Sequence, residues 1–234
     1  LVAAETPRDE GPFGVRLLRI RTLRFAIAAQ VFAFFALGGL SFWVTTYLVR
    51  HYHLTTGAAS LIVGGLFVLS GAVGTVGGGY LADLLLPRLP YARMLVPGCG
   101  YLAAGLTVAL GLLAPTFPLF LFWYAIAGVL VQLYSGPLSA LIQDVTPPAS
   151  RGRAVALSQL IAHLFGDAFA PTLIGIVSAG LGGATGNGLD RALWLTPAAA
   201  IVAGIVALAG CRSVAADRAA VLAGEAHSSE ALVR

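Results

Sequence analysis

The sequence predicts an all-α polytopic membrane protein with six transmembrane helices. Of its 234 residues, 58% are hydrophobic and only 10% are charged, whereas a soluble domain carries about 25% charged residues. The apolar residues form runs long enough to meet the roughly 20 residues that a helix needs to cross a bilayer. Short charged or proline-containing segments separate these runs. An even number of spans places both ends of the chain on the same side of the membrane.

The apolar runs also set the expected boundaries. The six helices are expected at residues 25–49, 56–86, 94–113, 119–145, 151–179 and 192–211. Residues 1–24 are expected to form a basic cytoplasmic linker, and residues 212–234 a loosely ordered cytoplasmic tail. Within the second helix, Gly74 and Gly78 have GxxxG spacing, which predicts the close approach of another helix.

The arginines indicate the orientation. All 14 basic residues are Arg, and 12 of them fall in residues 1–24, 83–93, 147–153 and 212–234; only Arg50 and Arg191 lie on the other side. The positive-inside rule therefore predicts cytoplasmic termini, in a protein expected in a bacterial inner (plasma) membrane. No basic run is interleaved with aromatic residues, so nucleic acid is not an expected partner. Cys99 and Cys211 lie in apolar stretches, and neither a metal nor a cofactor is expected.

The fifth expected helix carries a polar stripe. Gln159, His163 and Asp167 are four residues apart and therefore share one helix face. An ionised Asp in the middle of a span costs about 3 kcal/mol, so this face should turn toward a partner helix or a water-filled space. Two interpretations stay open: a buried His163–Asp167 pair that holds helices together, and a polar lining that substrate or protons contact.

Further polar residues extend the candidate substrate pathway. On the fourth helix, Gln132, Ser135 and Ser139 recur at intervals of three and four residues. On the first helix, Gln30 and Trp43 are weaker candidates. We expect these residues and the stripe of the fifth helix to line one wall of a cavity.

Two loop segments carry a recognisable pattern. Gly79 and Asp83 are followed by Arg88 and Arg93, and Arg151 and Arg153 lie in the loop before the fifth helix. This arrangement resembles one half of a major facilitator superfamily transporter, although Leu84 replaces the usual basic residue after the aspartate. The resemblance implies that Asp83 and the arginines latch two halves together on the cytoplasmic side. The alternative for each arginine is that it only sets topology.

Two longer stretches resemble the spinster-like branch of that superfamily. Residues 36–43, ALGGLSFW, resemble its seventh helix, and residues 163–171, HLFGDAFAP, resemble its eleventh-helix signature. The resemblance implies the carboxy-terminal six-helix half of a twelve-helix protein, with an amino-terminal six-helix half as its partner. It also implies export of lysolipids, sphingoid phosphates or other amphiphiles, with the coupling carboxylates usually in the other half.

The leading hypothesis is a secondary active transporter that works by alternating access within the lipid bilayer. Its substrate would be a small molecule, amphiphilic or lipid-like, and transport would be coupled to an ion or a proton, since His titrates near neutral pH. The mechanism needs no covalent chemistry, so the protein is not expected to be an enzyme. Two alternatives remain: an intramembrane enzyme that uses His163 and Asp167, and a complete six-helix protein that acts as a dimer.

Overall fold

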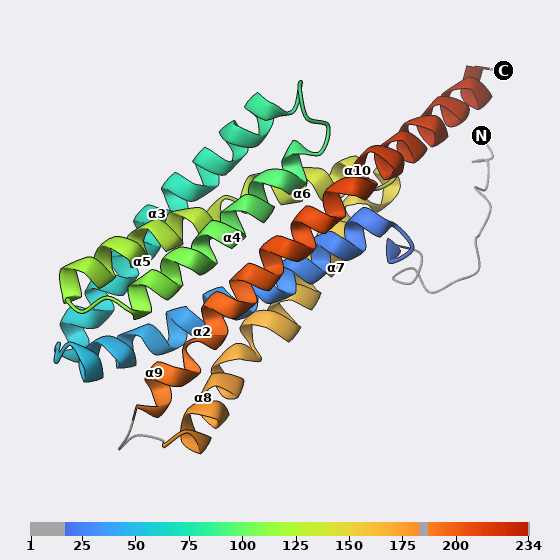
Figure 1. Cartoon of the computed structure of the whole chain (residues 1–234). Helices are drawn as coiled ribbons and strands as arrows, with labels where there is room; N and C mark the ends of the chain where they lie inside the picture. The colour runs from blue at the N-terminus through green and yellow to red at the C-terminus, as the bar shows by residue number, and fades with distance from the viewer. Residues whose placement is uncertain (1–16, 183–186, 234) are drawn as a thin grey trace.

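A computed structural model of the chain describes residues 17–182 and 187–233, and for residues 226–233 it describes the backbone only. Those residues are helical apart from short turns and connections, and Figure 1 shows the helices side by side in one bundle. Six spans are long and apolar enough to cross a membrane. The predicted fold class is thereby confirmed, and the chain is an integral membrane protein.

The six spans are built from eleven helical segments. The first three spans are α2 (Arg21–His51), α3 (Thr56–Leu85) and α4 (Ala92–Leu112). The fourth is divided into α5 (Phe117–Gln132) and α6 (Ser135–Asp144). The fifth consists of a short 3-10 turn η1 (Pro148–Ser150), α7 (Arg151–Ala162), the π-helical segment η2 (His163–Asp167) and α8 (Ala170–Gly180). The sixth is divided into α9 (Gly188–Ala192) and α10 (Leu195–Val233).

Three prolines explain where the last three spans are interrupted. The expectation of one continuous helix over residues 119–145, and of another over 151–179, was wrong on this point. Proline has no backbone N–H, so the carbonyl four residues before it loses its helical hydrogen bond. For Pro137, Pro171 and Pro197 those carbonyls belong to Leu133, Asp167 and Leu193. Each of these residues lies at or beside an interruption between the helical segments.

The chain after Arg212 is helical, and the expectation of a loosely ordered tail was wrong. α10 continues without interruption to Val233 and projects beyond the other helices (Figure 1). The segment is rich in alanine, the residue with the highest helix propensity. Three contacts tie it to the bundle. The Asp217 carboxylate accepts a hydrogen bond from the Thr22 backbone N–H at 2.7 Å, the Ser213 and Thr22 hydroxyls lie 2.9 Å apart, and Arg151 pairs with Glu225 at 3.0 Å.

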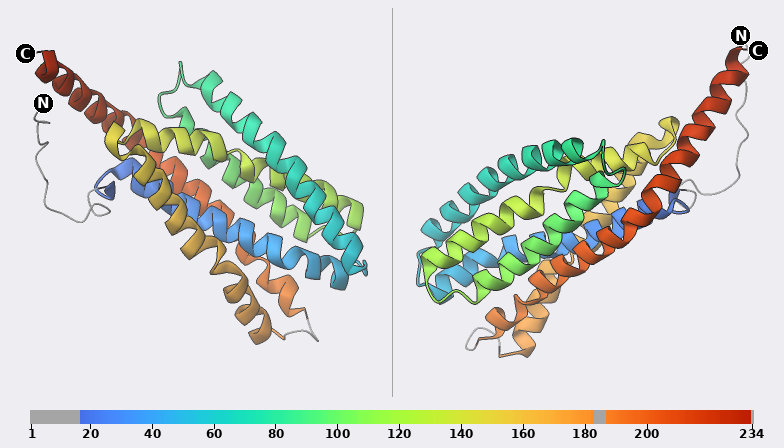
Figure 2. Two further views of the ribbon diagram at one scale, coloured as in Figure 1. Left: turned by 180° about the vertical axis from the view of Figure 1, so that it is seen from behind. Right: turned by 45° about the horizontal axis from the view of Figure 1, so that its top comes forward.

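The six spans differ in how deeply they are buried. In the most apolar stretches of α2, α4 and the sixth span, 50% of residues are buried. The corresponding values for the second, fourth and fifth spans are 22%, 17% and 22%. In Figures 1 and 2, α3 and α8 lie at opposite edges of the bundle. The first group therefore forms the centre of the bundle, whereas α3, α5–α6 and α7–α8 present broad apolar surfaces outward.

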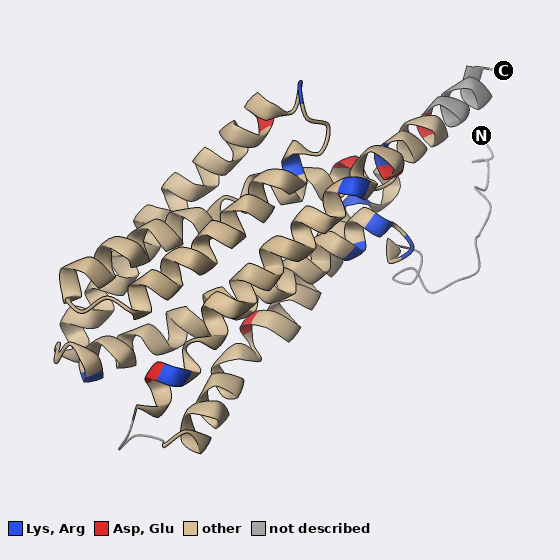
Figure 3. Ribbon diagram, viewed as in Figure 1, with Lys and Arg blue, Asp and Glu red and all other residues tan. Residues whose placement is uncertain are grey.

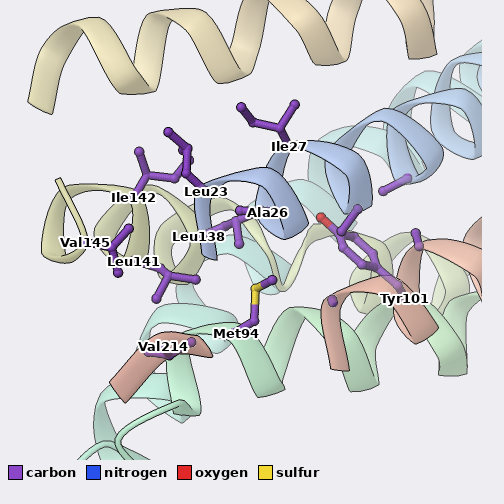
Figure 4. Packing of buried hydrophobic residues seen from close by; sticks show 14 of the residues in the cluster. Leu23, Ala26, Ile27, Met94, Tyr101, Leu138, Leu141, Ile142, Val145 and Val214 are labelled. Carbon is purple, nitrogen blue, oxygen red and sulfur yellow. The ribbon is translucent and has the colours of Figure 1, made fainter. Parts of the chain in front are cut away.

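Two large apolar clusters and a smaller one around Ala36 hold the bundle together. The larger cluster joins α2, α4, α6 and α10, and Figure 4 shows Leu23, Met94, Leu138 and Val214 converging in it. The second cluster lies at the opposite end, around Tyr47. At that end the Tyr52 hydroxyl donates a hydrogen bond to the Ala114 carbonyl at 3.0 Å, and burial raises the pKa of this phenol.

Glycines allow α3 to approach the fourth span closely, as their GxxxG spacing predicts. A Cβ atom at Gly74 would lie 2.5 Å from the Val129 carbonyl oxygen, and one at Gly78 would collide with the Leu133 carbonyl. Neither position has room for a side chain. Only glycine fits at this contact.

Candidate functional site

A cavity of about 470 Å³ lies between four of the spans. We call it the central cavity. Its lining residues come from α2, α3, the α5–α6 region and the fifth span: Phe34, Leu37, Ser41, Phe67, Gln132, Tyr134, Gln159, His163 and Asp167. These residues fall near the middle of their spans, at the depth where secondary transporters place their substrate sites.

The π-helical segment η2 positions the two titratable residues of the cavity. The Ala168 N–H bonds to the His163 carbonyl at 2.9 Å, five residues back rather than four. The extra residue widens one turn, which is a common feature of functional sites in helices. This turn begins at His163 and ends at Asp167, and the two side chains still contact each other at the i, i+4 spacing that the sequence predicts.

Two glycines let α2 pack tightly on η2. A Cβ atom at Gly38 would collide with the Asp167 carboxylate and lie 3.0 Å from the Asp167 Cα. A Cβ atom at Gly166 would lie 2.5 Å from the Val31 carbonyl oxygen and 2.8 Å from the Phe34 Cβ. The carboxylate is therefore held against the backbone of α2 by the absence of side chains at these positions.

His163 and Asp167 form an open pair. The His163 Nδ1 lies 3.4 Å from the Asp167 Oδ2, and the two side chains are 60% and 48% exposed in this chain. The imidazole also packs edge-on against Phe34, with ring centroids 4.8 Å apart. The pair is not buried between helices of this bundle, contrary to the first of the two interpretations of the stripe. Both side chains are available to a ligand, to water or to a further protein segment.

The central cavity brings together Gln132, Gln159, His163 and Asp167, four of the eight residues expected on the substrate pathway. The remaining four lie elsewhere. Ser135 and Ser139 are half-buried on α6, where the Ser139 hydroxyl donates to the Ser135 carbonyl at 2.9 Å. Gln30 is 1% exposed, and its side-chain oxygen has no hydrogen-bond partner among the described residues. The Trp43 indole N–H donates to the Pro171 carbonyl at 3.0 Å.

Five lining residues were not predicted from the sequence. Phe34, Leu37 and Phe67 are apolar and have no feature that distinguishes them from core residues. Ser41 is one of the few polar residues on the first span, and its polarity could have identified it as a lining residue. Tyr134 lies in the interruption between α5 and α6, and Pro137 was the sequence feature that could have indicated it.

A narrow apolar pocket adjoins the central cavity. It shares Leu37, Ser41 and Phe67 with the cavity and extends between α2, α4, α5 and α10. Its volume of about 40 Å³ gives room for about three water-sized groups, since one needs about 10–15 Å³. We call it the side pocket. The other lining residues are mostly apolar: Ala36, Leu40, Ser70, Ala104, Val108, Tyr124, Ala127, Gly128, Val131, Thr196 and Ala200.

The loop residues form ion pairs at the end of the bundle where α2 begins. Arg93 contacts Asp83 at 3.1 Å and Asp144 at 2.7 Å, and so joins the ends of α3, α4 and α6. Arg151 bonds to the carbonyls of Gln143 and Thr146 as well as to Glu225.

The other residues of the loop motif lie near the surface of the chain. Arg88 and Arg153 are exposed, and a Cβ atom at Gly79 would meet no other atom within 4 Å. In this chain Asp83 and Arg93 connect helices of the same six-helix unit, and Asp144 is a partner that the sequence did not single out.

The chemistry available in the central cavity is hydrogen bonding, ion pairing and proton exchange. The carboxylate and imidazole can exchange a proton with water or with a ligand, and the two glutamine amides can donate and accept hydrogen bonds. Within the described residues there is no group of three or more His, Cys, Asp or Glu side chains that could hold a metal ion.

Comparisons with known proteins define the class. Residues 7–113 match the Organic Anion Transporter Polypeptide (OATP) family. The chain superposes on a crystal structure of a bacterial homolog of the human lysosomal transporter spinster, in an inward-facing and unoccupied conformation, with a TM-score of 0.76. That match has 21% sequence identity and covers 92% of this chain and 53% of the other. The fold is therefore that of a six-helix unit of the major facilitator type.

Spinster proteins are also among the sequence relatives. "Protein spinster homolog 3" of Danio rerio is 30% identical over 176 residues, which are 69% of this chain and 35% of the relative. "Sphingosine-1-phosphate transporter SPNS2" of Mus musculus is 28% identical over 230 residues, 87% of this chain and 41% of the relative. In sequence and in fold, the chain matches spinster proteins. It spans less than half the length of each of these two relatives.

Proposed function

We propose that the chain is the carboxy-terminal six-helix half of a secondary active transporter. The observation that carries the proposal is the position of the central cavity, which places a half-exposed carboxylate and an imidazole at mid-span. An ionisable residue in a span is costly and usually marks a transport pathway or a contact within the protein. The match to a spinster structure over about half its length, 53%, supports the assignment to one half.

The proposed partner is an amino-terminal half of similar fold. It would cover the outward surfaces of α3, α5–α6 and α7–α8 and close the central cavity from the other side. Alternating access then consists of rocking the two halves about the site near the bilayer midplane. His163 is the proposed proton-carrying group, because imidazole titrates in the physiological range. Asp83, Arg88, Arg93, Arg151 and Arg153 are the proposed contacts that support gating at the cytoplasmic end.

The proposed orientation places both termini in the cytoplasm. Figure 3 shows that the charged residues are concentrated at the two ends of the bundle, with most arginines at the end where α2 begins. The arginine count favours the cytoplasm for that end. On this basis the proposed location is a bacterial inner membrane.

The proposed substrate is a small amphiphile. The central cavity offers polar groups, and the side pocket beside it offers a narrow apolar space. Such a pair of neighbouring spaces suits a molecule with a polar head and an alkyl chain. The names of several relatives, which refer to sphingolipid or sphingosine-1-phosphate transport, support the same class.

Flux measurements in proteoliposomes test this function. The full-length gene product is reconstituted, and exchange of a labelled lysophospholipid and a labelled sphingoid phosphate across the bilayer is followed. Wild-type protein should exchange at least one of them faster than protein-free vesicles, and the excess should fall at least tenfold in Asp167→Asn. The matched control Asp190→Asn changes a carboxylate that pairs with His51 at the opposite end of α2, and should retain exchange. Equal flux in vesicles with and without protein contradicts the proposal.

A further inference from the structure

We infer that the central cavity recognises a protonated amine and that Asp167 is the anionic partner of this ammonium group. The inference rests on the proposed transport function and specifies the head group of the amphiphile. It follows from the charges, the hydrogen-bond acceptors and the aromatic rings of the cavity wall.

The charge of the wall favours a cation. Among the nine lining residues, Asp167 is the only acidic one and His163 is the only one that can become positive. The chain has no lysine, and its arginines lie toward the two ends of the bundle (Figure 3). With neutral imidazole the wall carries one negative charge, and with protonated imidazole it carries none. In neither state does this wall carry a net positive charge.

The acceptors of the wall match the donors of an ammonium group. An alkylammonium has three N–H donors and no acceptor. Asp167 offers carboxylate oxygens, and Gln132 and Gln159 each offer an amide oxygen to the same cavity. Hydrogen bonds between charged groups are about twice as strong as those between neutral ones. A desolvated ammonium would therefore find both a counter-ion and neutral acceptors in one place.

Aromatic rings add to the same preference. Phe34, Phe67 and Tyr134 line the cavity, and Phe34 packs against both Tyr134 and the His163 ring. The faces of such rings attract cations within about 6 Å. The side pocket then lies beside the head group and takes part of the alkyl chain.

The inference concerns one end of the ligand only. A molecule such as sphingosine-1-phosphate, named for the mouse relative, carries both an amine and a phosphate. For a ligand of this kind, the amine end would face Asp167, and the phosphate would be bound outside the wall that this chain provides.

A matched pair of ligands tests the inference. Binding of radiolabelled dodecylamine and N-dodecylacetamide is measured on the full-length protein in nanodiscs, with empty nanodiscs as the background. Acetylation removes the positive charge and retains the alkyl chain. We expect the amine to bind about tenfold more tightly than its acetylated form, which corresponds to the difference between a charged and a neutral hydrogen bond.

Variants assign the preference to one carboxylate. Asp167→Asn should abolish the difference between amine and amide, while Asp167→Glu and the distant Asp190→Asn should retain it. Elution as a single species on size exclusion verifies that each variant is folded. Should Asp167→Asn not fold, Asp167→Ser takes its place: loss of the preference in this folded variant would support the site, and its retention would contradict it.

Two results overturn the inference. One is equal binding of the amine and its acetylated form, and the other is an amine preference that persists in folded Asp167→Asn. Either result leaves the proposed transport function standing if the flux assay is positive. Absence of protein-dependent flux, by contrast, contradicts the proposed function itself.

Discussion

The central cavity depends on one half-exposed carboxylate held against a glycine. Asp167 lies on a π-helical turn, and its side chain packs on Gly38 of α2. Its contact with His163, at 3.4 Å between two half-exposed side chains, belongs to a class of ion pairs that stabilise proteins by about 1 kcal/mol or less. The position of the carboxylate therefore has more consequence for ligand contacts than for stability.

Asp167→Asn separates these two roles. The amide keeps nearly the same shape, so the melting temperature of the full-length protein should change little. Transport should fall strongly, because the negative charge of the cavity is lost. Thermal unfolding and flux of the variant and of the wild-type protein are measured on the same preparations. A parallel loss of stability and transport would indicate that the pair is structural.

Gly38→Ala tests the close contact on the other side of the carboxylate. The added methyl group collides with Asp167, and overpacking of this kind costs about 1–3 kcal/mol. The variant should melt at a lower temperature and bind amine ligands more weakly. Gly64→Ala is the matched control, because a Cβ atom there has no neighbour within 4 Å. Equal behaviour of the two variants would show that α2 and η2 have room to separate.

At the scale of single residues, sequence reasoning succeeded where a polar side chain interrupts an apolar helix. Gln159, His163 and Asp167 were predictable because the membrane makes such residues costly unless they face inward. Ser135 and Ser139 do not line the cavity, because a hydroxyl can instead bond to a backbone carbonyl of its own helix, as that of Ser139 does. Sequence reasoning could not find Phe34 or Phe67, since aromatic residues are common throughout apolar spans.

At the scale of the helices, apolar runs determine the number of spans and prolines determine where the spans are interrupted. Long apolar runs predicted the number and type of the spans, because only helices satisfy the backbone within lipid. The interruption before Pro137, the π-turn before Pro171 and the division before Pro197 follow from missing N–H groups. The backbone geometry at each interruption depends on the neighbouring helices, so it could not be predicted from a run of apolar residues.

The contact between α3 and α5 rests on two glycines, and Gly74→Leu should disrupt it. The leucine side chain would meet the Val129 carbonyl and Gln132, which also displaces a cavity residue. We expect a lower yield of folded protein and a lower melting temperature. Gly64→Leu, on the same helix but facing open space, should be tolerated far better. Wild-type behaviour of Gly74→Leu would contradict the observed packing.

The extension of α10 is a structural element, and its removal should be measurable. Truncation after Arg212 removes Asp217, which satisfies a backbone N–H in the first turn of α2, and Glu225, which pairs with Arg151. A hydrogen bond to a charged group contributes about 1.5–3 kcal/mol, so the melting temperature should fall. Asp217→Asn should reproduce part of the loss. An unchanged melting temperature after truncation would mean that the extension contributes nothing to the bundle.

At the scale of the whole molecule, the distribution of buried surface is asymmetric. The α2, α4 and α10 helices form the centre, whereas the second, fourth and fifth spans are only 17–22% buried in their most apolar stretches. The central cavity opens between α2 and the three spans that expose most surface. This arrangement is expected of one half of a two-half transporter, in which the second half covers the cavity.

Accessibility of the cavity from both sides of the membrane tests this account most directly. Cys99 and Cys211 are replaced by alanine in the full-length protein, and Gln159→Cys is labelled with a membrane-impermeant thiol reagent in vesicles of both orientations. The account predicts labelling from either side, with rates on the two sides shifted in opposite directions by a transported amphiphile. Labelling from one side only, unaffected by any amphiphile that the protein binds, would contradict alternating access.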